Sequence, residues 1–136
     1  MQRFELVADI KKICAVLQFI KEDMVQLKID EHTQFNVAMV AEEIFSNIAL
    51  YAYQEKTAES VVITTELIDD YYSITFSDHG KAYNPLTQAE PDLSVDLNRR
   101  PIGGLGVFLS KKLSDDITYK RKNLQNILCI KFKLAK

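Results

Sequence analysis

The chain has 136 residues, of which 47% are hydrophobic and 26% charged, and its formal net charge is −2. This length favours one domain with a packed core, and the composition is that of a globular protein rather than a disordered tail or a fibre. The slightly acidic balance argues against non-specific nucleic-acid binding, which needs a basic face. Because no apolar run approaches the roughly 18 residues of a membrane span and no signal-like segment opens the chain, we expect a cytoplasmic, bacterial-like protein.

The first half of the sequence predicts a short strand followed by two amphipathic helices. Arg3 to Val7 forms the strand. The first helix is predicted from apolar residues at spacings of three and four, namely Ile10, Ile13, Leu17, Ile20, Met24 and Leu27. The second helix is predicted to begin after Asp30, whose side chain can cap free N–H groups, and to end near Tyr53.

From Val61 onward the hydrophobic period changes to two. Two alternating runs on either side of Asp69-Asp70 predict an antiparallel hairpin. A short helix from about Leu105 to Leu113 follows, and then a second hairpin in which Ile117 and Tyr119 face the last strand. We therefore expect an α+β fold, a two-layer sandwich with helices on one face of a mixed, mainly antiparallel sheet, as a single domain over residues 1–136.

The two cysteines lie in apolar patterns without a second thiol or a histidine at metal-site spacing. Free cysteine is among the most buried residue types. We expect Cys14 and Cys129 to be buried, reduced thiols.

All four glycines and all three prolines lie between Gly80 and Gly106. Glycine permits positive φ and close approach of backbone to a ligand, whereas proline excludes a regular ladder. This concentration of glycine and proline in one stretch indicates a long irregular loop framed by two tight turns. In a small domain such a loop is usually a lid or a binding segment.

The first polar cluster is Glu43 and Asn47 on the second predicted helix. A spacing of four residues places both on one helix face, about 40° apart. A carboxylate beside an amide oxygen can polarise a nucleophile and bind Mg²⁺, which prefers oxygen ligands. Solvated helix faces also carry this pair commonly, so the pair alone leaves a purely structural role open.

The second cluster runs from Asp78 through Gly80 and Tyr83 to Pro85, directly after a predicted strand. The Asp78 carboxylate can accept a hydrogen bond from an exocyclic amine, and Gly80 permits a ligand ring to lie against bare backbone. The alternative is a plain Asp/Gly turn. We expect His79 to be an exposed turn residue rather than a metal ligand or a base.

The third cluster precedes a predicted helix and comprises Gly103, Gly104, Leu105, Gly106 and Val107. Free N–H groups at a helix N-terminus attract phosphate. The segment is not a Walker loop, since no Gly-Lys-Ser/Thr closes it, and it is a poor dinucleotide fingerprint because Leu109 occupies the third glycine position. A structural turn remains the alternative.

In this order, the three clusters resemble the GHKL ATPase superfamily of gyrases, histidine kinases and mismatch-repair ATPases. Within it the chain is similar to the small anti-sigma-factor serine kinases of partner-switching systems, over nearly its whole length. The resemblance implies that Glu43 is a general base, that Asn47 is a Mg²⁺ ligand, and that Asp78 recognises the adenine amino group. The residues implied to surround the nucleotide with Asn47 and Asp78 are Gly80, Tyr83, Gly103, Gly104, Leu105, Gly106 and Val107.

Three further positions bear on the resemblance. Asn126 looks like the asparagine that often opens the last strand in this family. Tyr51 stands where many relatives have histidine, and Tyr83 replaces the commoner phenylalanine. Both replacements are conservative in shape.

The function implied is an ATP-dependent protein serine kinase that binds Mg–ATP beneath a lid at about residues 84–102. Its substrate would be a serine of a STAS-domain anti-anti-sigma factor, with a sigma factor or another output protein as competing partner, and the protein would be a homodimer. Arg99, Arg100 or Lys111 would offset phosphate charge. The alternatives are a nucleotide-gated regulatory binding module without turnover and a structural domain without ligand, while a histidine kinase is disfavoured because we see no phosphoacceptor helix.

Overall fold

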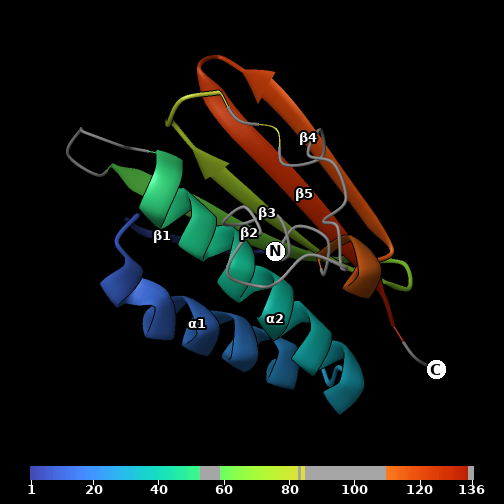
Figure 1. Ribbon diagram of the computed structural model, residues 1–136. Helices are drawn as coiled ribbons and strands as arrows, with labels where there is room; N and C mark the ends of the chain where they lie inside the picture. The colour runs from blue at the N-terminus through green and yellow to red at the C-terminus, as the bar shows by residue number, and fades with distance from the viewer. Residues whose placement is uncertain (53–58, 83, 85–109, 135–136) are drawn as a thin grey trace, which may run out of the picture.

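The computed structural model describes residues 1–52, 59–82, 84 and 110–134 (Figure 1). Its elements in chain order are β1 (Gln2–Val7), a 3₁₀ turn (Ile10–Lys12), α1 (Ile13–Gln26), α2 (Glu31–Asn47), a π-helical segment (Ile48–Ala52), β2 (Ser60–Ile68), β3 (Tyr71–Asp78), β4 (Asp116–Lys122) and β5 (Gln125–Lys133). Residues 110–113 are also helical. Of the predicted helix from Leu105 to Leu113, the first half lies outside the described residues.

The described strands form a five-stranded sheet in the order β1-β2-β3-β5-β4. Every pairing between these described strands is antiparallel, so the sheet is antiparallel rather than mixed. Both α1 and α2 cover the same face of the sheet (Figure 1). The predicted α+β two-layer sandwich is confirmed.

Side-chain caps set the helix starts. Asp30 is the N-cap of α2, and its Oδ2 accepts from the backbone N–H of Thr33 at 3.0 Å, as the sequence predicts. The first helix differs from its prediction, because Asp9 caps a separate 3₁₀ turn and regular α-helix begins only at Ile13. α2 ends at Asn47 and continues as a π-helical segment to Ala52, where the described part of this region stops.

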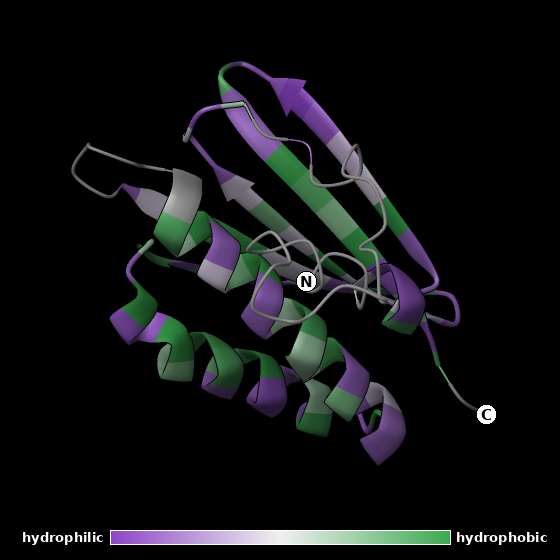
Figure 2. Cartoon of the chain, in the orientation of Figure 1, coloured by the Kyte–Doolittle hydropathy of each residue, from purple (hydrophilic) through white to green (hydrophobic). Residues whose placement is uncertain are grey.

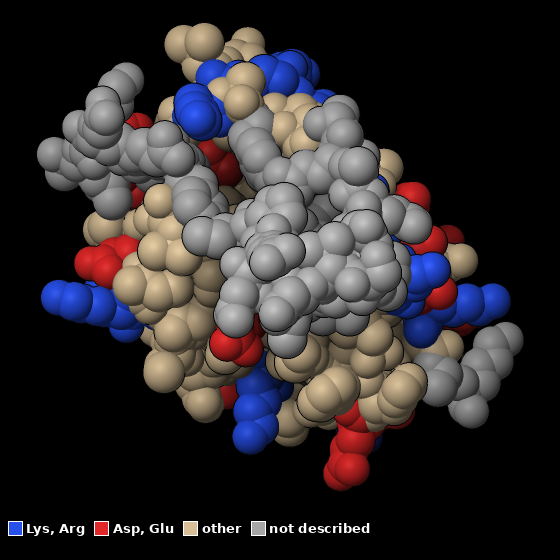
Figure 3. All heavy atoms as spheres, viewed as in Figure 1, with Lys and Arg blue, Asp and Glu red and all other residues tan. Residues whose placement is uncertain are grey.

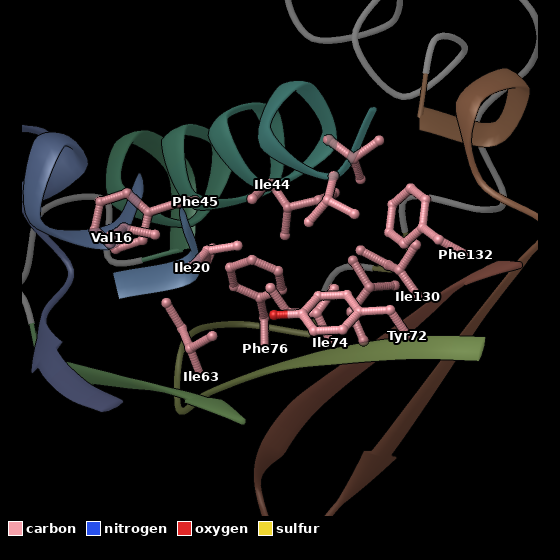
Figure 4. Close-up of a cluster of buried hydrophobic side chains, with 14 of the residues drawn as sticks. Val16, Ile20, Ile44, Phe45, Ile63, Tyr72, Ile74, Phe76, Ile130 and Phe132 are labelled. Atoms are coloured by element: carbon pink, nitrogen blue, oxygen red, sulfur yellow. The ribbon is translucent and has the colours of Figure 1, made fainter. Parts of the chain in front are cut away.

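The core lies between the helices and the helix-facing side of the sheet. Figure 4 shows Ile44 from α2 and Ile74 and Phe76 from β3 pointing into the same space. Alternate residues of each strand contribute to this core, because successive side chains of a strand point to opposite faces. The largest side chains buried in it are Tyr72, Phe45, Phe76, Phe132, Ile20, Met24, Ile63, Ile74 and Ile130.

The predicted second hairpin is confirmed, and in its register Ile117 lies opposite Ile130 and Tyr119 opposite Leu128. Its two-residue turn, 123–124, has positive φ at both positions, 53° and 64°. Two-residue turns in which both residues have positive φ match the right-handed twist of the flanking strands. The turn thereby fixes which β4 residues face the helices.

The prediction that both cysteines are buried is wrong. Cys14 is exposed on α1 and Cys129 is half-buried. Cys129 alternates with the buried residues Leu128 and Ile130 and so faces the side of the sheet that carries no helix. Cys14 follows Ile13 by about 100° around the helix, which turns it away from the sheet.

No helix in the described ranges combines the length and the apolar character that crossing a bilayer requires.

Candidate functional site

A polar cluster occupies one end of the helix-facing side of the sheet. Asp78 is the last residue of β3 and lies two residues after Phe76, so its side chain shares the core-facing side. It is only 4% exposed. Its Oδ1 accepts from the Gly80 backbone N–H at 2.8 Å and from Asn126 Nδ2 at 3.0 Å. Both hydrogen bonds that reach this carboxylate from described residues end on Oδ1, so Oδ2 keeps its capacity to accept.

The β4–β5 hairpin supplies the rest of this polar end. Asn126 pairs in register with Asp78 on one side and with Arg121 on the other. The Tyr119 hydroxyl donates to Asn126 Oδ1, which directs the asparagine N–H groups toward Asp78 and the Lys81 carbonyl, the latter at 2.9 Å. Figure 2 shows the same change along β5, which is hydrophilic where it leaves the turn and hydrophobic in its middle.

The second part of the candidate site is the last turns of α2. Glu43 and Asn47 are both half-buried there, and their side chains are hydrogen-bonded to each other. Burial raises the pKa of Glu43 and the neighbouring Glu42 charge raises it further, whereas the Asn47 hydrogen bond opposes the shift. The C-terminal ends of α2 and β3 lie at the same end of the sandwich (Figure 1).

These groups fit an adenine nucleotide and a hard cation on chemical grounds. An ionised carboxylate only accepts hydrogen bonds, so Asp78 Oδ2 suits an amino group. Asn47 offers an amide oxygen, the ligand type that Mg²⁺ prefers beside waters and phosphate oxygens. In the described parts of the chain no three His, Cys, Asp or Glu side chains gather as a metal cluster.

Several predicted residues lie outside the described part of the chain. They are Tyr83, Gly103, Gly104, Leu105, Gly106 and Val107, together with Arg99, Arg100 and all of the predicted lid except Asn84. Lys111 is exposed on the helix 110–113. His79 is exposed, as expected, and one of its ring nitrogens lies 2.9 Å from Gln125 Nε2.

Sequence reasoning missed Tyr119 and Arg121. For Tyr119 the sequence predicts only that it faces the last strand, and for Arg121 it makes no prediction. Strand alternation was the available signal, because Arg121 follows Tyr119 by two residues and so shares its face. Its partner, the Gly80 carbonyl, has no sequence signature.

Several known proteins are similar to this chain in sequence. The profile of the family described as "Histidine kinase-like ATPase domain" matches residues 6–132. The chain is 25% identical over 97 residues to the serine/threonine-protein kinase BtrW of Bordetella bronchiseptica, covering 71% of this chain and 68% of that protein. It is 29% identical over 97 residues to the serine-protein kinase RsbW of Staphylococcus aureus, covering 66% of this chain and 60% of the relative.

Solved structures share the fold. The RsbU and RsbW domains of a Mycobacterium tuberculosis protein align over 100% of this chain and 33% of that one, with a TM-score of 0.71 and 12% identity. The Acinetobacter baumannii histidine kinase AdeS aligns over 100% of this chain and 70% of its own, with a TM-score of 0.54 and 17% identity. At these identities the likeness concerns the fold alone.

The resemblance drawn from the three sequence clusters is thus confirmed at the level of the family, and the kinases that match are of the RsbW type. The described helices and strands lie almost entirely within the matched residues. The chain belongs to the histidine kinase-like ATPase family.

Proposed function

We propose that this protein is an ATP-dependent protein serine kinase of the anti-sigma-factor type. It transfers the γ-phosphoryl group of Mg–ATP to a serine of a STAS-domain anti-anti-sigma factor. The observation that carries the proposal is the buried Asp78 carboxylate, with one oxygen held by the turn and the hairpin and the other able to accept from an amine.

At the adenine end, Asp78 accepts from the exocyclic amino group and Gly80 lets the ring approach the backbone. Both residues are buried, which excludes competing water and strengthens the hydrogen bond. Tyr83 belongs to the same end in this proposal. This assignment of Tyr83 rests on the sequence alone, since the residue lies outside the described part of the chain.

At the phosphate end, Glu43 accepts the proton of the substrate serine and Asn47 binds the metal. The raised pKa of Glu43 makes its carboxylate a stronger base than an ordinary exposed glutamate. Bound ATP would supply the phosphoryl group and the Mg²⁺ held at Asn47 would offset its negative charge, since phosphoryl transfer depends mainly on positioning and charge neutralisation. We propose that backbone N–H groups of the segment 103–107 hold the phosphates. This assignment too rests on the sequence alone.

The proposed partners follow from the kind of relative that this chain matches. BtrW and RsbW are named serine kinases, which supports a protein substrate over a small molecule. We assign the STAS-domain factor as substrate, a sigma factor or another output protein as the competing partner, and a homodimer as the working form.

Nucleotide binding is tested first by thermal unfolding. At Mg–ATP concentrations of about 100 times the dissociation constant, the free energy of unfolding should rise by roughly 2.7 kcal/mol. GTP at the same concentration is the control and should shift the unfolding temperature less. The absence of any shift with ATP or ADP would remove the proposal.

Phosphoryl transfer is tested with a candidate STAS protein and radiolabelled ATP. Glu43→Ala should lower the transfer rate by about 10²-fold to 10⁴-fold and retain ATP binding. Glu42→Ala, one residue earlier on the same helix, is the matched control and should change the rate far less, since it removes only the smaller, electrostatic contribution to the raised pKa of Glu43. Full activity of Glu43→Ala rejects Glu43 as the base, and ATP binding without transfer by the wild type favours the regulatory binding module.

A further inference from the structure

The turn after β3 is tied to the β4–β5 hairpin by side chains of the hairpin. Arg121 Nη1 donates to the Gly80 carbonyl at 2.8 Å. Asn126 Nδ2 donates to the next carbonyl, that of Lys81, at 2.9 Å. Two consecutive peptide groups of the turn are therefore held from outside, although the donors lie more than 40 residues away in sequence.

These contacts converge on the orientation of one carboxylate. Asp78, Asn126 and Arg121 form a single row across β3, β5 and β4. Asp78 Oδ1 receives its two hydrogen bonds from Gly80 and Asn126. The first of these donors is the Gly80 N–H. Arg121 holds the carbonyl of the same glycine, so it limits the rotation of this N–H about the glycine backbone.

We infer that Arg121 is a positioning residue for base recognition, which holds the turn so that Asp78 presents Oδ2 to an amino group and thereby selects adenine over 6-oxopurines. The inference rests on the proposed nucleotide site. It adds to it the source of base specificity, through a residue that does not touch the nucleotide.

The chemistry of the bases explains why orientation matters. Adenine carries an amino donor at position 6, whereas hypoxanthine carries an oxygen acceptor there. A carboxylate oxygen facing that position accepts from the amine and repels the oxygen. A site built around a specific hydrogen bond discriminates strongly only when its polar group is fixed, because a mobile group can turn away from the wrong partner.

Arg121 differs from the neighbouring basic residues of β4 in the face of the sheet on which it lies. Figure 3 shows Lys and Arg side chains gathered over the hairpin end of the molecule. Lys120 and Lys122 belong to β4 as well, but alternation places them on the face of the sheet that carries no helix, opposite to Arg121. Lys122→Ala is therefore a charge-matched control for Arg121→Ala.

The first measurement is the dissociation constant of Mg–ATP and of Mg–inosine triphosphate by calorimetry, with the full chain. Arg121→Ala should weaken ATP binding roughly tenfold and leave inosine triphosphate within about twofold, so that the ratio of the two constants falls. Arg121→Lys keeps a donor and should restore part of the ratio. Lys122→Ala should change neither constant.

An equal loss of affinity for both nucleotides in Arg121→Ala, or no loss, overturns the inference. An equal loss with a lowered unfolding temperature would mark Arg121 as structural only.

The second measurement needs no nucleotide. Amide hydrogen exchange of Gly80 in the apo protein should accelerate about tenfold in Arg121→Ala and stay unchanged in Lys122→Ala. If the wild type binds neither nucleotide, the proposed function fails, and this exchange rate still decides whether Arg121 orders the turn. Unchanged exchange in Arg121→Ala overturns the inference whatever the nucleotide results.

Discussion

The helix-facing side of the sheet holds two regions built on the same strands. Its middle is apolar, with Tyr72, Ile74 and Phe76 in sequence along β3, and its end is polar, beginning at Asp78. The alternation of the strand continues through the change, so only the residue types differ. The middle gains stability from burial, whereas the end holds buried polar groups that must satisfy one another. We therefore expect substitutions in the middle to change stability, and substitutions at the polar end to change the nucleotide recognition proposed for it.

Phe76→Ala should have the largest effect, because it removes a fully buried ring from the apolar middle. We expect a loss of about 4 kcal/mol in the free energy of unfolding, measured by urea denaturation. Phe35, which is 61% exposed on α2, is the control. Phe35→Ala should cost less than about 0.5 kcal/mol. Equal losses would contradict the assignment of the core.

Asp78→Asn should act at the polar end instead. The amide retains an oxygen for the Gly80 and Asn126 donors but places an NH₂ where Oδ2 was. ATP affinity should fall by about 2.5 kcal/mol, roughly 70-fold, while affinity for inosine triphosphate rises. The unfolding free energy should change little. If Asp78→Asn keeps its preference for ATP over inosine triphosphate, the proposal that the polar end recognises the base is contradicted.

Tyr72→Phe tests a polar pair inside the apolar middle. The buried Tyr72 hydroxyl donates to Asp23 Oδ2 at 2.7 Å, and Asp23 is itself only 7% exposed. Removing the hydroxyl leaves a buried carboxylate without this donor, so we expect a loss of about 2 kcal/mol at pH 7. Tyr71→Phe on the opposite face of β3 is the control and should be nearly neutral.

The same tyrosine predicts a pH dependence. Burial, and then the hydrogen bond and charge of Asp23, raise the pKa of Tyr72 above its ordinary value of 10. Between those two pKa values the folded chain holds a proton that the unfolded chain loses, so stability falls as pH rises above about 10. Urea unfolding from pH 8 to 11 should show a shallower loss in Tyr72→Phe; an unchanged slope would argue against the coupling.

Glu43→Gln should have the smallest effect on stability, and in the opposite direction. Because the pKa of Glu43 is raised in the folded protein, its ionised form costs stability above about pH 4.5. The variant should be more stable than the wild type at pH 7 by about 0.5 kcal/mol, allowing for solvent screening, and the difference should vanish near pH 4. Exposed Glu42→Gln serves as the control and should give a smaller gain, because it removes only the charge repulsion from Glu42 and leaves the burial of Glu43 unchanged.

Local features of the fold could be predicted from the sequence. The Asp30 cap of α2 and the β4–β5 hairpin depend on neighbours within a helix turn or a hairpin, where spacing fixes geometry. The order of the inner strands could not be read the same way. The insertion of β5 between β3 and β4 depends on which apolar faces pack best, not on a local signal.

The candidate site divides in the same way. The proximity of Asp78 and Gly80 follows from their adjacency in sequence, whereas the bond from Arg121 to Gly80 joins residues 41 positions apart. The Asp23–Tyr72 pair, 49 positions apart, was also missed. A signal existed, because Asp23 follows Ile20 by three residues and so lies on the apolar stripe of α1.

The strand order has a consequence for synthesis of the protein on the ribosome. Among the described strands β5 is the last in sequence, yet it is interior, between β3 and β4. A nascent chain therefore cannot complete its sheet until residues 125–133 have emerged. Asn126 reaches Asp78 only at that moment, so the polar end is assembled last, and a ribosome stalled earlier would carry a chain without it.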